Sequence, residues 1–233
     1  MSNKILTKVK DPFLFDLDYL EIHSLIADFN KIRNSKVKYE RNIKISISSD
    51  YNSNYLTEFL PLFFANKGMN IEVYEKEFGS LNFLSRETDN QFWKKNTDLF
   101  LLMPSYKNLS FPKTTDKFSL IKKKAQKDAK RWINLWKKTN KKIIQTTFDP
   151  PFYSNFGEVD GVKLGGYLHY IRLVNSVLIE KKPSNVHLVD IENLIFKNKK
   201  TKWNDSKIYN LTKQPFSMET IPILSNQIGN AAK

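Results

Sequence analysis

The sequence contains no cysteine among its 233 residues. This absence excludes disulfide bonds and thiolate zinc sites, and it fits a reducing compartment. Glycine is scarce, with seven residues, and neither GxxxxGK[ST] nor GxGxxG occurs, which argues against a nucleotide-binding phosphate cradle. No run of about 18 uncharged apolar residues is present, and the start MSNKILTKVKDPFLF lacks the apolar core of a signal peptide. We therefore expect a soluble, cytoplasmic protein that does not enter a membrane.

Histidine is almost as rare as cysteine. His23, His169 and His187 are far apart, and none stands at HxH, HxxxH or HExxH spacing. His187 falls inside a predicted strand, where a half-buried histidine with a hydrogen-bond partner is the simplest interpretation. We predict no metal site and no cofactor.

Positive charge, by contrast, is abundant: 38 Lys and Arg against 24 Asp and Glu give a net charge of +14. Such a surface attracts nucleic acid, anionic lipid or an acidic protein. Lys, Asn, Ile and Phe are common throughout, so an AT-rich genome also accounts for much of the charge. The basic segments 122–124, 137–142 and 197–202 could follow phosphates, but no known nucleic-acid-binding motif occurs. A nucleic-acid-binding domain therefore stays an alternative that we do not favour.

Five short apolar runs have the length and composition of β-strands, at residues 42–47, 70–75, 98–103, 142–146 and 186–190. Helical periodicity separates several of them, with a stripe from Leu56 to Phe64 that Gly68 closes as a C-cap, and further helices at 118–136, 164–180 and 218–228. One face of the 118–136 helix collects Phe118, Ile121, Ala125, Ala129, Trp132 and Trp136. Strands that alternate with helices predict a three-layer α/β fold with a mostly parallel sheet of about five strands.

Residues 1–40 are predicted to form a helical appendage to a domain that spans residues 41–233. The string FLFDLDYL superficially matches the DxDx[TV] motif of haloacid-dehalogenase-like phosphatases, but Leu20 stands where Thr or Val is required. We interpret Asp16 and Asp18 as charges that favour the start of a helix at 19–32, with Leu20, His23, Leu25, Ile26 and Phe29 on its apolar face.

Ligand sites of parallel sheets lie in the loops after the strands, so the SSDYN segment is the first place to look for chemistry. Ser48 and Ser49 stand where an SGNH-type esterase keeps its nucleophile. Such a serine needs a histidine polarised by an aspartate, usually in a late DxxH motif. Asp190 and Asp205 open DIEN and DSKIYN instead. We take Ser48, Ser49 and Asp205 as catalytic candidates, with the triad histidine not found.

The order of several segments resembles the amino-terminal SGNH-hydrolase-like domain of FkbH-like proteins, which belong to subfamily IIIC of the haloacid dehalogenase (HAD) superfamily. These segments are ISISSDYNSNYLTEFLPLFFANKGMNIEVYEKEFGS, FDPPFYSNFG, LGGYLHYIRLVNSVLIE, VHLVDIENLI and KWNDSKIYNLTKQPFSMETIPILSNQI. The resemblance implies an SGNH- or flavodoxin-like fold. It also implies that Asp50, Asn52, Gly79, Asp190 and Tyr209 bind substrate on the cleft side.

In that family a phosphatase-like domain with a DxDxT motif follows, and it is associated with loading a glyceryl unit onto an acyl carrier protein. No such domain is present in this sequence, so we expect one in cis or in trans. Our first hypothesis is an accessory domain, not hydrolytic alone, that supports glyceryl-type acyl transfer to an acyl carrier protein in secondary-metabolite or polysaccharide biosynthesis. A divergent SGNH esterase or O-acyltransferase, with His169 as its base, is the enzymatic alternative, and whether the domain is an enzyme stays open.

Overall fold

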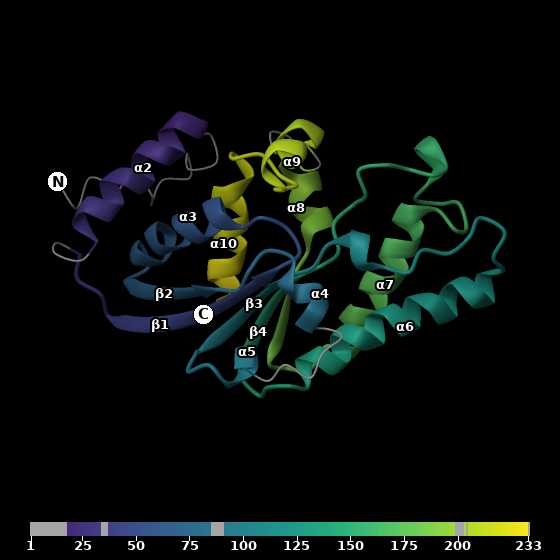
Figure 1. Ribbon diagram of the computed structural model, residues 1–233, viewed down its shortest axis with the longest axis horizontal. Helices are drawn as coiled ribbons and strands as arrows, with labels where there is room; N and C mark the ends of the chain where they lie inside the picture. The colour runs from purple at the N-terminus through teal and green to yellow at the C-terminus, as the bar shows by residue number, and fades with distance from the viewer. Residues whose placement is uncertain (1–17, 34–36, 85–90, 199–202, 204, 233) are drawn as a thin grey trace.

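The computed structural model describes residues 18–33, 37–84, 91–198, 203 and 205–232. Its centre is a five-stranded, all-parallel sheet in the order β2-β1-β3-β4-β5 (Figure 1). The strands are β1 (Arg41–Ser49), β2 (Met69–Glu75), β3 (Leu99–Met103), β4 (Lys142–Thr146) and β5 (Val186–Val189). This arrangement confirms the predicted α/β fold, and its strand order is the one found in flavodoxin-like proteins.

The central strand β3 explains why the sheet must be covered on both faces. All five of its residues are buried, and they alternate between two hydrophobic clusters. Leu99, Leu101 and Met103 enter one cluster, whereas Phe100 and Leu102 enter the other. A strand that is apolar on both sides is typical of parallel sheets with helices on each face.

The helices divide between these two clusters, as the layers of Figure 1 show. The first cluster takes α2 (Tyr19–Ile32), α3 (Asn54–Ala65), α8 (Ile191–Lys197) and α10 (Thr220–Ala232). The second takes α4 (Ser80–Leu84), α5 (Gln91–Lys94), α6 (Phe118–Trp136) and α7 (Tyr167–Lys181). The short elements η2 (Tyr106–Asn108), η3 (Gly157–Val159) and α9 (Ser206–Thr212) lie in the connections.

Helix α2 begins with a capping box at Asp18. The Asp18 carboxylate accepts a hydrogen bond from Glu21 N at 2.9 Å, and the Glu21 side chain accepts one from Asp18 N at 3.0 Å. The helix start is therefore as predicted, whereas Asp16 lies outside the described residues. The buried face includes Ile22 and Phe29, but Leu20 is 72% exposed and His23 is also exposed, so the predicted face was wrong at these two positions. Helix α2 packs into the same cluster as α3.

Several other predicted bounds and exposures differ from those in the structure, because contacts between distant parts of the chain determine them. Strand β1 extends through Ser49 because its last residues pair with the end of β3, so the two serines lie in a strand and not in a loop. Phe118 is 48% exposed in the first turn of α6, and His187 is exposed on the edge strand β5, contrary to the predicted half-buried position. Gly68 has a φ of 75° but lies beyond the C-cap of α3, which is Asn66.

None of the described helices is both long and apolar enough to cross a membrane.

Candidate functional site

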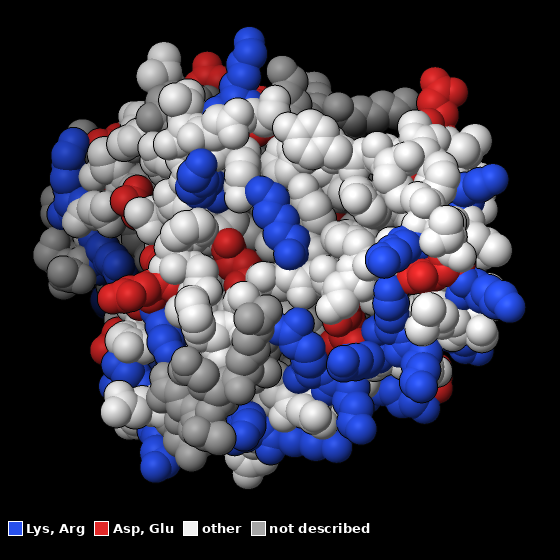
Figure 2. Space-filling model, turned by 45° about the vertical axis from the view of Figure 1, so that its right-hand side comes forward, with Lys and Arg blue, Asp and Glu red and all other residues white. Residues whose placement is uncertain are grey.

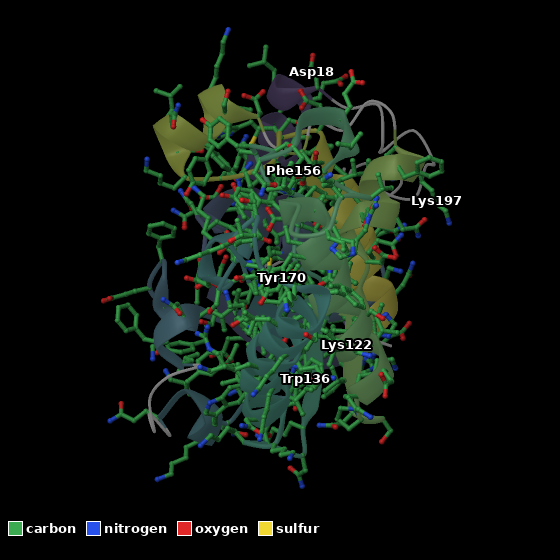
Figure 3. All side chains as sticks on the ribbon, turned by 90° about the vertical axis from the view of Figure 1, so that its right-hand side faces the viewer. Asp18, Lys122, Trp136, Phe156, Tyr170 and Lys197 are labelled. Atoms are coloured by element: carbon green, nitrogen blue, oxygen red, sulfur yellow. The ribbon has the colours of Figure 1, made fainter. Side chains whose placement is uncertain are left out.

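The candidate site lies at the carboxyl edge of the sheet, where the chain leaves β1, β3 and β4. In a sheet of this order the connections from β1 and β3 run in opposite directions, and a crevice forms between them. Asp50 follows β1 directly, and its backbone N–H donates to Met103 O at the end of β3, at 3.0 Å. In Figure 3, Phe156, in the connection after β4, lies above Tyr170, whereas Trp136, the last residue of α6, lies below it.

Asp50 is held by the backbone of two neighbouring connections. Its carboxylate accepts hydrogen bonds from Asn82 N at 2.9 Å and from Ser105 N at 3.1 Å. Burial raises the pKa of Asp50 to about 6, although hydrogen bonds and the charge of Arg131 act in the opposite direction. Arg131 reaches the same corner from α6 and donates to Asn108 O and Asn82 Oδ1. This edge of the sheet therefore holds a carboxyl group whose charge changes near pH 6.

A second carboxyl group, Asp149, lies just after β4 and is only 2% exposed. It accepts hydrogen bonds from Tyr106 N and from Trp203 Nε1, both at 3.3 Å. Burial raises the pKa of Asp149 to about 6, while these hydrogen bonds and the Lys107 charge oppose the rise. The protonated and ionised forms of both aspartates are thus close in free energy near pH 6.

Tyr51 is buried where the charges of both carboxyl groups act on it. Its side chain is 3% exposed, and its ring meets Phe216 edge-on at a centroid distance of 5.9 Å. Burial is the main reason that the pKa of Tyr51 lies well above its ordinary value, and the charges of Asp149 and Asp50 add to the effect. Because burial and two nearby carboxylates raise its pKa, the Tyr51 hydroxyl stays protonated and can donate a hydrogen bond but does not ionise.

The outer rim of the site combines lysine with aromatic rings. Lys107 Nζ lies 3.7 Å from the centroid of the Tyr209 ring, and Lys213 Nζ lies 5.5 Å from it. The Tyr209 ring packs against Phe152 at a centroid distance of 5.0 Å. This rim presents positive charge to solvent above a buried carboxyl group, an arrangement that favours an anionic or polar ligand.

Ser48 and Ser49 are placed differently from a hydrolase nucleophile. Ser48 is fully buried, and its hydroxyl is hydrogen-bonded to that of Ser80 at 3.0 Å. Ser49 is 3% exposed, and its hydroxyl accepts a hydrogen bond from Tyr51 N at 3.1 Å. His169 lies in α7, and within the described residues no hydrogen bond joins its ring to either serine. The structure brings the two serines to the site but does not bring a histidine to them.

The other predicted residues divide between caps and the rim. Asp190 and Asp205 accept hydrogen bonds from the first backbone amides of α8 and α9, so their carboxylates serve as N-caps. Asn52 donates from its side chain to Thr212 O at 2.9 Å, which anchors the end of α9. Gly79 adopts a φ of 76°, and its N–H donates to Ser49 O at 3.0 Å. Tyr209 alone of this set contributes its ring to the rim.

The sequence patterns did not indicate Asp149, Lys107 or Arg131 as site residues. Asp149 begins the DPP of the segment FDPPFYSNFG directly after a predicted strand, and that position was the signal available for it. Lys107 and Arg131 gave no comparable signal, because a predicted helix or loop carries many lysines and arginines in this sequence. Among the described residues, no group of three His, Asp or Glu side chains is placed to hold a metal ion.

Comparison with known proteins adds two matches. A family model described as FkbH, N-terminal domain, matches residues 44–231. The solved structure of the N-terminal part of protein BF1531 from Bacteroides fragilis, containing a phosphatase domain complexed with Mg, superposes with a TM-score of 0.68 at 15% identity. The superposition covers 81% of this chain and 50% of that one, so the chain spans about half the length of the solved protein. The curated protein sequences gave no match.

Proposed function

Because this chain belongs to the family of FkbH N-terminal domains, we propose that it is a non-hydrolytic binding module that works beside a phosphatase-like domain. In this proposal it orients an acyl carrier protein, or the acyl group that the carrier receives, during glyceryl-type transfer in secondary-metabolite or polysaccharide biosynthesis. The phosphatase-like domain acts in cis or in trans. The solved structure of similar fold, which contains a phosphatase domain in the same chain, supports this pairing.

The observation that carries the proposal is the burial of both serine hydroxyls. Ser48 and Ser49 are 0% and 3% exposed and are engaged in internal hydrogen bonds. A serine attacks an acyl group only when a base can take its proton and the substrate can reach its oxygen. Both hydroxyls are buried, and among the described residues their hydrogen bonds are to Ser80 and to the backbone rather than to a base, which supports a non-hydrolytic role. The rim of Lys107 and Tyr209, by contrast, is accessible to a ligand.

Charge supplies the second line of support. Acyl carrier proteins are acidic, and this chain has a net charge of +14. Figure 2 shows lysine and arginine side chains gathered on the lower part of the face it presents, where α6 lies. Helix α6 exposes Lys122, Lys123, Lys127 and Lys130 there. Complementary charge mainly accelerates encounter and selects partners, so it fits a transient carrier complex.

Binding to an acidic acyl carrier protein, measured by titration at two salt concentrations, tests the proposal. Raising the salt from about 0.1 M to about 1 M shortens the Debye length from about 10 Å to about 3 Å and should weaken the complex strongly. Lys107→Gln should weaken it by about two- to fivefold. Lys138→Gln removes the same charge just after α6, near the start of β4, and should have no effect. Absent or salt-independent binding would contradict the proposal.

Labelling with a fluorophosphonate tests the non-hydrolytic part separately. Because both hydroxyls are buried and unactivated, we expect no label on Ser48 or Ser49. Labelling of either serine, lost in Asp205→Asn, would support the esterase or O-acyltransferase alternative instead. Retention on single-stranded DNA that is lost when residues 122–124 are neutralised would favour the nucleic-acid alternative.

A further inference from the structure

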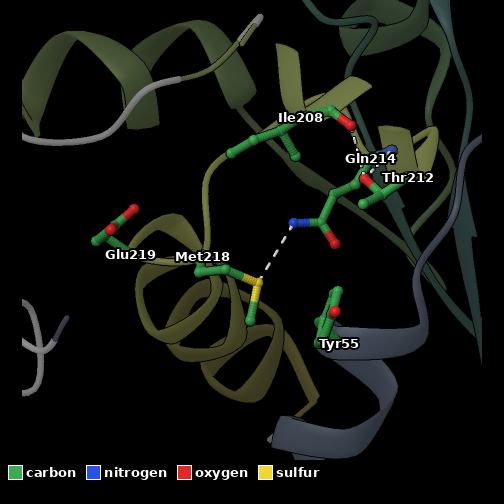
Figure 4. A pocket seen from close by; sticks show the side chains of 6 residues that line it. All are labelled: Tyr55, Ile208, Thr212, Gln214, Met218 and Glu219. Atoms are coloured by element: carbon green, nitrogen blue, oxygen red, sulfur yellow. Dashed lines mark hydrogen bonds between the residues drawn. The ribbon is translucent and has the colours of Figure 1, made fainter. Parts of the chain in front are cut away.

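A cavity opens between the end of α9, the start of α10 and the start of α3. Its volume is about 250 Å³, and its walls are Tyr55, Ile208, Thr212, Gln214, Met218 and Glu219 (Figure 4). Ile208 and Thr212 are four residues apart and therefore share one face of α9. Tyr209, which belongs to the rim described above, points from a different face of that helix. The cavity is thus separate from the site at the carboxyl edge.

The polar feature of this cavity is the amide oxygen of Gln214. The residue is 1% exposed, yet within the described part of the chain its Oε1 atom has no hydrogen-bond partner. Figure 4 shows this oxygen directed into the space between Met218 and Tyr55. A buried acceptor without a partner is rare in proteins and calls for a donor.

The orientation of the Gln214 amide follows from its other contacts. Its Nε2 donates to Phe216 O at 2.8 Å and lies 3.9 Å from Met218 Sδ. Exchanging the two amide atoms would set an oxygen against the carbonyl oxygen of Phe216, which is repulsive. The backbone N–H of Gln214 also donates to Thr212 Oγ1 at 3.2 Å and fixes the residue. The acceptor is therefore aimed into the cavity by the local structure.

We propose that this cavity binds a small neutral aliphatic molecule that carries one N–H or O–H donor. The donor would bond to Gln214 Oε1, and the aliphatic part would contact Ile208 and Met218. The half-buried carboxylate of Glu219 at the cavity wall disfavours an anion. One water occupies about 30 Å³ in the liquid, so the cavity suits a ligand of about eight non-hydrogen atoms. This inference does not depend on the carrier-protein proposal, because it concerns a different face of α9.

Two molecules of equal size test whether an N–H donor on the ligand contributes to binding. N-butylacetamide and butyl acetate have the same number of non-hydrogen atoms, but only the amide has an N–H group. Titration of each into the full chain, followed by NMR of the methionine methyl groups, measures the two dissociation constants. The amide should bind about five- to tenfold more tightly, which is the expected effect of one net hydrogen bond.

Variants of Gln214 decide whether that preference comes from the proposed contact. In Gln214→Leu the preference for the amide should disappear, whereas Gln227→Leu makes the same change at an exposed position of α10 and should keep it. Equal affinity for amide and ester in the unmodified chain, or a preference that survives in Gln214→Leu, overturns the proposal.

A second variant covers the case in which Gln214→Leu does not fold. Ile208→Phe adds bulk to a half-buried residue of the cavity wall and leaves Gln214 in place. It should reduce amide binding at least about tenfold by filling the space. Unchanged binding in Ile208→Phe would place the ligand elsewhere and also overturn the proposal.

Discussion

Ionisation of Asp149 should weaken the fold at neutral pH. Burial raises the pKa of this carboxyl group from 3.8 to about 6, so the folded state holds its proton more tightly than the unfolded state does. A raised pKa contributes stability that is fully present below the unfolded value near 3.8. That contribution is lost as the pH rises through about 6.

The magnitude follows from the size of the rise. One pKa unit corresponds to about 1.4 kcal/mol, so a change from 3.8 to about 6 amounts to about 3 kcal/mol in the free energy of unfolding. Between pH 4 and pH 7 about 2 kcal/mol of this should be lost, because part of the change lies outside that interval. Asp149 is 2% exposed, so solvent screening reduces the effect little.

The assay compares the unfolding free energies of the natural chain and Asp149→Asn in urea across this pH range. Asparagine removes the titration, so the difference between the two proteins should change by about 2 kcal/mol in favour of the variant from pH 4 to pH 7. Any constant cost of the substitution cancels in this comparison.

A partly buried aspartate whose pKa is shifted in the opposite direction supplies the control. The hydrogen bond from Lys124 lowers the pKa of Asp116, so its contribution is present at neutral pH and is lost as the pH falls through the lowered pKa. The difference between Asp116→Asn and the natural chain should therefore change with pH in the opposite direction. A difference for Asp149→Asn that stays flat from pH 4 to pH 7 would refute the reasoning.

Further substitutions test the packing of the fold, each by chemical unfolding. Gly166→Ala should cost more than about 3 kcal/mol in the free energy of unfolding, because the new carbon meets a backbone oxygen at 2.0 Å. Gly161→Ala meets the tip of Arg172 at 2.7 Å and a Leu168 methyl group at 3.3 Å, both movable side-chain ends, and should cost less than about 1 kcal/mol. Asn175→Leu should cost about 2 to 4 kcal/mol, since the amide pairs with both the N–H and the C=O of Phe148; a loss below about 1 kcal/mol would contradict this. Asp205→Ala should cost about 1 kcal/mol by removing an N-cap, and replacement by Asn should restore most of it.

The sequence by itself determined the architecture and the family. The five strands and the main helices follow from short apolar runs and helical periodicity, and these local properties gave their bounds to within a few residues of the structure. The start of α2 was equally predictable from the sequence, because the capping box at Asp18 involves residues only three positions apart. The family resemblance, based on the order of several segments, was confirmed by the match over residues 44–231.

Only the tertiary structure decided which side chains form the candidate site. Asp50 is held by Ser105, 55 positions away, and Asp149 by Trp203, 54 positions away, so neither environment is visible in a local pattern. The same holds for Ser48, whose strand position depends on pairing with β3. Long-range burial and hydrogen bonding set the charge state and access of these groups, and no short stretch of sequence contains that information.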